Sequence, residues 1–238
     1  MRKISLEKLP VLLETIAAGM PLFLPVDTKA GAEFIKYEPG MTPSDALLTT
    51  RSAKDTFFPQ TENLMNFKVD GKKIEVIDTR VECEDFVVYG VRPCDARAFR
   101  VLDNVFLAEP VDTFYKNRRD HALIISLTCD RPAETCFCKT FGIDPANPDC
   151  DIAAYKKSGY LCLDAKTDKG QALLAKLENV CRTAASHSEG AFPPEIHAQA
   201  RLLSREIRRT LFLRRLRPLP EGLPDRHEHR QGNEEAGR

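Results

Sequence analysis

Two groups of cysteines, each placed directly after an apolar run, constrain the fold of this chain most strongly. The first, Gly90-Val-Arg-Pro-Cys94-Asp95, follows Phe86-Val-Val-Tyr89, and the second, Cys129-x6-Cys136-Phe-Cys138, follows Ala122-Leu-Ile-Ile-Ser-Leu-Thr128. Such short, apolar and partly β-branched runs predict strands that are buried on both faces of a sheet. Sites in open α/β sheets gather at the carboxyl ends of the strands. If these strands are parallel neighbours, the thiols of both groups meet in one crevice.

Four converging thiolates indicate an iron–sulfur cluster first and a zinc site second. A ligand must be a thiolate, and Cys94 lies at a strand-to-helix turn where free N–H groups favour the ionised form. Cys136 and Cys138 are two residues apart, so both would face the same side of a regular strand. The candidate ligands are Cys94, Cys129, Cys136 and Cys138.

The spacing of these cysteines leaves other interpretations open. It differs from the C-x2-C-x2-C run of ferredoxins and from the usual knuckle spacing of structural zinc sites. A redox-active thiol pair and a set of buried apolar cysteines under a loop are the remaining alternatives. Cys83, Cys162 and Cys181 are predicted to be structural cysteines, whereas Cys150, which follows the ligand loop, could line the site.

Composition limits the class of protein. The chain has 238 residues with 35 basic and 35 acidic side chains, which gives no electrostatic case for nucleic acid as a partner. No apolar run approaches the ~18 residues of a membrane span, and the amino terminus lacks the apolar core of a signal peptide. We therefore expect a cytoplasmic protein. Disulfides are rare there, so its eight cysteines need another explanation.

The pattern of apolar residues predicts an α/β fold with a mixed central sheet and flanking helices. We expect a cluster-binding domain over residues 1–200, with the cysteine site at strand ends, and then a partly helical, disordered tail over residues 201–238. Asp70-Gly71 between alternating segments indicates a β-hairpin. Helices are predicted at 5–18, 95–107, 111–119, 168–180 and 195–213, strands at 21–27, 32–37, 86–89, 122–128 and 159–163, and long loops at 39–60 and 130–151.

Charged side chains near the cysteines could place hydrogen bonds and positive charge beside an anionic cluster. Such groups tune the reduction potential of a cluster. For Arg118 and Arg119 a solvated helix end is an equally good interpretation. The set comprises Arg92, Asp95, Arg97, Arg118, Arg119 and Lys139.

Several of these motifs together resemble a known family. Pro59-Gln-Thr-Glu62, the Pro93-Cys94-Asp95 turn, Leu102-Asp103, Tyr115 with Arg118-Arg119, and Cys129-x6-Cys136-Phe-Cys138 are similar to the amino-terminal domain of a family of iron–sulfur electron-transfer subunits. That family includes the beta subunit of cytoplasmic sulfhydrogenases and an iron–sulfur subunit of anaerobic sulfite reductase. The resemblance covers roughly residues 21–198, and it implies a 4Fe–4S cluster on the four candidate cysteines.

The family continues with a carboxyl-terminal dicluster ferredoxin domain, which carries two sets of C-x2-C-x2-C-x3-C-P. This sequence has no cysteine after Cys181, and we expect a truncation or a reading frame shifted after about Gln199. The resemblance implies an electron-transfer subunit, or an amino-terminal piece of one, with flavin- or NAD-binding, hydrogenase or sulfite reductase subunits as partners. The alternatives are a non-conducting scaffold and a zinc-stabilised binding module.

Overall fold

The computed structural model describes residues 1–133, 135–138 and 140–183. The helix predicted at 195–213, the tail after residue 200 and Lys139 lie outside the described residues. The α-helices are α1 (Leu9–Gly19), α2 (Pro93–Phe106), α3 (Thr113–His121) and α4 (Asp168–Lys176), with 3-10 turns at Leu6–Lys8, Ala53–Thr56 and Thr79–Glu82. The strands are β1 (Arg2–Ser5), β2 (Leu22–Thr28), β3 (Gly31–Lys36), β4 (Met65–Asp70), β5 (Lys73–Asp78), β6 (Phe86–Val91), β7 (Ala122–Leu127), β8 (Ile152–Lys157), β9 (Tyr160–Ala165) and β10 (Arg182–Thr183).

A mixed eight-stranded sheet forms the centre of the fold, in the order β10-β1-β9-β8-β7-β6-β2-β3. The inner strands β2, β6, β7 and β8 are parallel, whereas β3 pairs antiparallel at one edge and β9, β1 and β10 pair antiparallel at the other. The predicted α/β class and the parallel pairing of β6 with β7 are therefore confirmed. Their carboxyl ends, which precede the two cysteine groups, lie side by side.

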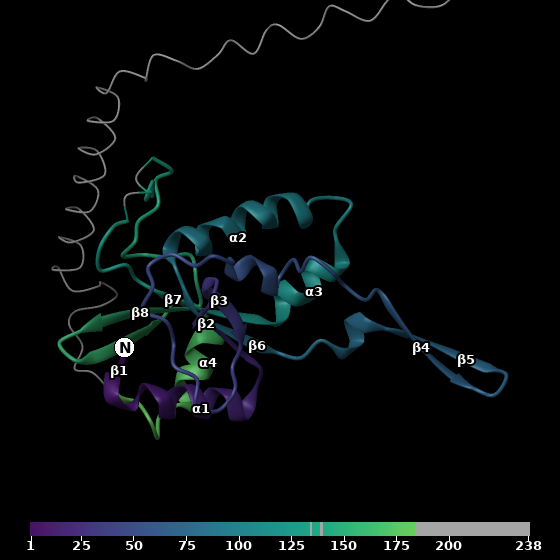
Figure 1. The fold of residues 1–238 in the computed structure, drawn as a ribbon, viewed down its shortest axis with the longest axis horizontal. Coiled ribbons are helices and arrows are strands. Elements are labelled where there is room, and N and C mark those ends of the chain that lie inside the picture. Colours follow the sequence, from purple (N-terminus) through teal and green to yellow (C-terminus); the bar gives the residue numbers. More distant parts are fainter. Residues whose placement is uncertain (134, 139, 184–238) are drawn as a thin grey trace, which may run out of the picture.

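Helices cover both faces of this sheet, as Figure 1 shows. Strand side chains alternate between the faces. In β7, Leu123, Ile125 and Leu127 therefore pack in the core with α1 and α4, whereas Ala122 and Ile124 pack against α2 and α3. This double burial explains why the β7 sequence is continuously apolar.

The helical spacing of the sequence predicts that Ala98, Val101, Leu102, Val105 and Phe106 form the inward face of α2. The structure confirms Leu102 and Phe106, which pack against the core. Val101 and Val105, which were expected on the buried stripe, are 59% and 64% exposed. The helix instead buries Ala96 and Phe99. Pro93 occupies the first helical turn and starts the helix two residues before the predicted position. The position at which the helix begins does not change which side chains share a face. The packing of α2 on β6 and β7 therefore decides which face is buried.

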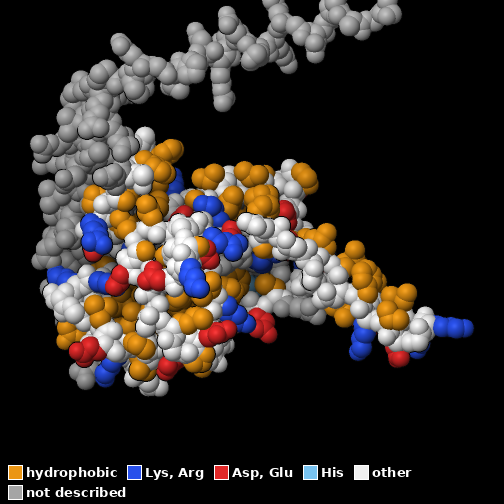
Figure 2. Space-filling model, viewed as in Figure 1, with side chains coloured by type: hydrophobic (Ala, Val, Ile, Leu, Met, Phe, Trp, Pro, Cys, Tyr) orange, Lys and Arg blue, Asp and Glu red, His pale blue; other side chains and the backbone are white. Residues whose placement is uncertain are grey.

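The hairpin of β4 and β5 forms a separate two-stranded sheet that projects from the body (Figure 1). Its predicted Asp70-Gly71 turn is confirmed, and Gly71 has a φ of +60°. One face carries apolar side chains, because Phe67 pairs with Val76 and Val69 pairs with Ile74 across the strands. Figure 2 shows this apolar surface along the hairpin. Its members Met65, Phe67, Val69, Ile74 and Val76 are 55–68% exposed.

No helix in the described part of the chain is long and apolar enough to cross a membrane. The described cysteines are all unpaired.

Candidate functional site

The site is built where β6 and β7 end. Gly90, with a φ of +84°, lies in a register shift between Tyr89 and Val91, and it directs the chain through Arg92 and Pro93 into α2. Cys94 therefore lies in the first turn of that helix. Cys129 follows the end of β7 and starts the loop that carries the other two cysteines.

The loop between β7 and β8 folds back on α2, beside its first turns (Figure 1). Asp149 near its end accepts hydrogen bonds from Arg97 at 3.1 Å and from Arg100 at 2.9 Å, both on α2. Cys138 is held by turn hydrogen bonds, because its carbonyl accepts the N–H of Ile143 at 2.8 Å. These hydrogen bonds hold the loop, with Cys136 and Cys138, near the start of α2.

The local conformation at Cys136 and Cys138 differs from the expected strand. The segment forms turns, in which the Cys136 N–H donates to the Ala133 carbonyl at 3.0 Å and the Ala133 N–H donates to the Cys136 Sγ at 3.2 Å. An isolated extended segment would leave its backbone groups unpaired, and the turns satisfy them locally. The aromatic residue between the two cysteines, Phe137, remains 53% exposed.

The four candidate thiols interact with one another. Cys94 donates a hydrogen bond to Cys138, which raises the pKa of Cys94 and lowers the pKa of Cys138. Burial raises the pKa of Cys129 to about 12, with Cys94 and Cys136 acting in the same direction and the nearby Arg92 opposing them. The four candidate thiols therefore lie near enough to one another to shift the pKa values of Cys94, Cys129 and Cys138.

The charge state of Cys94 differs from the expected thiolate. The hydrogen bond to Cys138, burial and the neighbouring carboxylate of Asp95 raise its pKa, and they outweigh the hydrogen bond from the backbone N–H of Asp95. Cys138, not Cys94, is the thiol of this pair that ionises first. A bound metal requires both thiols to be deprotonated, so it would lower the pKa of Cys94 as well.

Single-ion geometry is absent from the part of the chain that the structure describes, where no group of three or more His, Cys, Asp or Glu side chains is arranged to hold one metal ion. A single ion needs all its donors within ~2.0–2.3 Å of one point. The cysteines of an iron–sulfur cluster bind different irons, so they need not converge on one point. The donor set, four thiols with no imidazole among them, fits the soft-ligand chemistry of such a cluster.

The remaining charged candidates divide into two groups. Arg92 donates to the Ala46 carbonyl at 2.8 Å and lies near Cys129. Asp95 accepts from the Ser52 hydroxyl at 3.2 Å and pairs with Lys54 at 3.6 Å, which ties the 39–60 loop to the first turn of α2. Arg118 and Arg119 lie elsewhere, and neither expected interpretation describes them.

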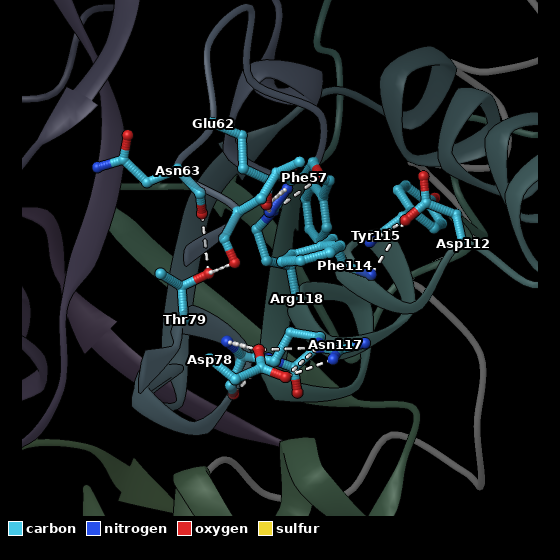
Figure 3. Close-up of polar contacts among 12 residues, drawn as sticks. Phe57, Glu62, Asn63, Asp78, Thr79, Asp112, Phe114, Tyr115, Asn117 and Arg118 are labelled. Carbon is cyan, nitrogen blue, oxygen red and sulfur yellow. Dashed lines mark hydrogen bonds and ion pairs between the residues drawn. The ribbon is translucent and has the colours of Figure 1, made fainter. Parts of the chain in front are cut away.

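Arg118 and Arg119 instead hold α3 against the rest of the fold, and Figure 3 shows Arg118 beside Phe57 and Glu62. Arg118 Nε donates to the Phe57 carbonyl at 3.0 Å, and its guanidinium pairs with Glu62. Arg119 Nε donates to Asp103 at 3.0 Å, and the Tyr115 hydroxyl donates to the same carboxylate at 2.7 Å. Several motif residues of the family resemblance thus form structural ion pairs that join α2, α3 and the 39–64 segment.

Replacing Asp103 by asparagine is expected to lower the free energy of unfolding by about 2–3 kcal/mol, because the partly buried guanidinium of Arg119 loses its counter-charge. Urea unfolding of the purified variant measures the change. The matched control is Asp149→Asn, whose pairs with Arg97 and Arg100 are more exposed and should contribute less than about 1 kcal/mol. Equal losses in the two variants would contradict this account.

Cys150, which sequence analysis left open, packs against two apolar clusters. Burial raises its pKa from 9.0 to about 12, and the causes do not include any of the four candidate ligands. Cys181 is buried in the core as predicted, at 2% exposure. Cys162 in β9 lies opposite Tyr155 of β8 and packs in the same cluster as Cys150.

Because the pKa of Cys150 is raised in the folded protein, the metal-free protein should lose stability as the pH becomes alkaline. The unfolded chain releases this proton near pH 9, whereas the folded chain keeps it to about pH 12. The stability contribution is therefore complete below pH 9 and is lost as the pH rises to 12, with a slope of ~1.4 kcal/mol per pH unit. In urea unfolding between pH 8.5 and 10.5, Cys150→Ala should show a shallower decline than the parent. Parallel curves for the two proteins would refute the assignment.

Comparison with known proteins gives a partial relative. No protein-family model matches the chain. A segment of 96 residues, 40% of this chain, is 36% identical to Sulfhydrogenase 2 subunit beta of Pyrococcus furiosus. The matched segment spans 27% of that relative's length. The similarity supports, at most, a relationship to subunits of this kind.

Proposed function

We propose that this chain is an electron-transfer subunit, or an amino-terminal part of one, in a multisubunit redox enzyme such as a hydrogenase or sulfite reductase complex. In this proposal Cys94, Cys129, Cys136 and Cys138 hold a 4Fe–4S cluster. The observation that supports it is that these cysteines follow the ends of two adjacent parallel strands and lie near enough to influence one another's pKa. The similarity to a sulfhydrogenase beta subunit supports the class of protein.

The side chains around the thiols suit this role. Cys94 lowers the pKa of Cys138, and Arg92 supplies positive charge near the partly buried Cys129. The cluster, when bound, accepts and donates one electron at a time. A reducing cytoplasm is the proposed compartment, since eight unpaired cysteines are kept as thiols there.

An exposed aromatic pair beside the site suits the docking of a redox partner. Phe137 lies between two proposed ligands, and its ring is 5.3 Å from that of Phe141 in an edge-to-face arrangement. The two side chains are 53% and 64% exposed. Aromatic residues are enriched in protein interfaces, and a partner that covered this pair would lie next to the cysteine loop. The proposed partners are flavin- or NAD-binding, hydrogenase or sulfite reductase subunits.

The projecting hairpin supports assembly with other subunits. A two-stranded hairpin is marginally stable alone, and Phe67, Val69 and Ile74 are all more than 60% exposed on its apolar face. Apolar surface of this extent marks interaction sites in soluble proteins. We therefore propose that a partner subunit covers the hairpin in the complex.

Reversible reduction tests the electron-transfer role. The full chain, loaded with iron and sulfide without oxygen, should absorb visible light, lose intensity when dithionite is added, and regain it on reoxidation. A colourless protein that binds zinc alone would favour the zinc-stabilised module, and a chain that takes up neither metal would favour the scaffold. Either result would overturn the proposal.

A further inference from the structure

The projecting hairpin of β4 and β5 has two chemically different faces. Each strand residue shares a face with its cross-strand partner, and successive residues alternate between the faces. The apolar face carries no charged side chain from the turn down to Asp78 at its base. The opposite face carries the exposed charged side chains Lys68, Asp70, Lys73 and Glu75. This division is typical of a sheet that packs on another surface through one face and stays in water on the other.

Nothing in the described part of the chain covers the apolar face, whose five side chains are 55–68% exposed. Figure 1 and Figure 2 show that the hairpin stands clear of the body. Six paired residues in each strand give a hairpin of ~20 Å, since a strand rises ~3.4 Å per residue. A hairpin of this length can lie along a second one while the two bodies stay apart.

The area of the apolar face is sufficient for a dimer. Apolar side chains of this size and exposure each present roughly 100 Å² to solvent. Two such faces packed together would therefore remove about 1,000 Å² from water, which is the lower limit for a specific interface. Sheets pack face to face ~10 Å apart, with the side chains of their inner faces in contact. Two copies of the hairpin can therefore bury their apolar faces against each other.

The charges at the two ends of the hairpin favour a second copy in an antiparallel arrangement. Lys72 lies in the turn and has no ion pair among the described residues, whereas Asp78 lies at the base on the apolar face. Arg80 of the same chain pairs with Asp78, and a carboxylate can accept further hydrogen bonds. A two-fold axis between antiparallel hairpins would bring Lys72 of each chain over Asp78 of the other, while a parallel arrangement would oppose like charges.

We propose that the apolar face of the hairpin packs against the same face of a second copy of this chain, with the two hairpins antiparallel about a two-fold axis. The product is a two-layer β-sandwich of four strands, whose charged outer faces remain in water. A second copy is then the subunit that the proposed function expects at the hairpin. The dimer rests on that proposal in this respect alone, because it needs no cluster on the cysteines. Figure 1 shows the cysteine loop at the other end of the body from the hairpin, so each cysteine site stays open to a redox partner.

Sedimentation of the metal-free full chain tests the dimer. Interfaces of this area give micromolar or tighter affinity, so the parent should sediment at twice the mass of one chain at about 50 µM and dissociate on dilution. Val76→Lys, in the central row of the apolar face beside Phe67, places two ammonium groups near the two-fold axis and should weaken the dimer at least ~100-fold. The matched control is Val101→Lys on α2, because the two valines are 56% and 59% exposed, and it should dimerise as the parent does.

Hydrogen exchange locates the interface without a substitution. A two-stranded hairpin is marginally stable alone, so the amides of residues 65–78 should exchange at least ~10-fold more slowly in the dimer than in the diluted monomer. A parent that stays monomeric, a dimer that persists in Val76→Lys, or exchange at 65–78 that does not depend on concentration would overturn the inference. A monomeric parent that still binds iron and sulfide would leave the proposed function standing, so the two proposals can fail separately.

Discussion

Gly90→Ala is expected to lower the free energy of unfolding by about 3 kcal/mol, a large share of the ~5–15 kcal/mol that stabilises a typical domain. Gly90 has a φ of +84°, a conformation that costs a residue with a side chain ~1–2 kcal/mol. An added Cβ would also lie 3.0 Å from Cδ and 3.1 Å from Cγ of Pro25. That ring is part of β2 and cannot rotate away, so crowding adds ~1–3 kcal/mol.

Two other glycines separate these effects when the variants are compared by urea unfolding. Gly40 has a φ of +90° with nothing within 4 Å of an added Cβ, so Gly40→Ala measures the conformational cost alone. Gly19, in α1, has neither a positive φ nor a close neighbour, and Gly19→Ala should be neutral or stabilising. If Gly90→Ala cost no more than Gly40→Ala, the tight approach of β6 to β2 beside the site would be wrong.

Cys129→Ala is expected to abolish stable cluster binding and to expose the loop over residues 130–151 to proteases. In the loaded protein the loop is tied to the sheet through its ligands, and metal-binding free energy acts as folding free energy. Apolar packing cannot replace this binding energy. Among the described residues of the loop, Ala146 alone has a fully buried hydrophobic side chain. Chymotrypsin cleavage after the exposed Phe141 should become at least ~10-fold faster, a change of ~1.4 kcal/mol in opening free energy.

The matched control is Cys83→Ala, which removes a thiol in the segment before β6 that is not one of the proposed ligands. Limited proteolysis is followed by mass spectrometry on the loaded proteins. Cys83→Ala should keep the parent's iron content and its resistance to cleavage after Phe141. Equal cleavage rates for the parent and Cys129→Ala would show that the loop does not depend on its first cysteine.

The sequence was informative wherever a segment was buried on both faces or had a decisive turn. β6 and β7 are continuously apolar because two helical layers cover them, and Asp70-Gly71 fixed the hairpin. β1 escaped prediction because it is four residues long and has one buried residue, Ile4. β8 was not predicted as a strand, because Ile152-Ala-Ala-Tyr155 follows a stretch rich in proline and aspartate. Both depend on pairing with distant strands.

The sequence indicates candidate cysteines for a site, but it does not predict the interactions of the charged residues around them. The order of thiol ionisation depends on the contact between Cys94 and Cys138, which are distant in the chain. For Arg118 and Arg119 the sequence suggested either positive charge beside a cluster or a solvated helix end. Their positions are instead decided by ion pairs with Glu62 and Asp103. The motif pairing of Glu62 with Arg118 was a usable signal, because both residues belonged to the family resemblance.

The most direct measurement of the central claim is the iron and acid-labile sulfide bound per chain after anaerobic loading. The parent should bind about four of each, as a 4Fe–4S cluster requires. Alanine at Cys94, Cys129, Cys136 or Cys138 should each lower both values sharply, while alanine at Cys83 or Cys150 should leave them unchanged. Full iron and sulfide content in the Cys94→Ala protein, or none in the parent, would contradict a cluster shared by these four cysteines.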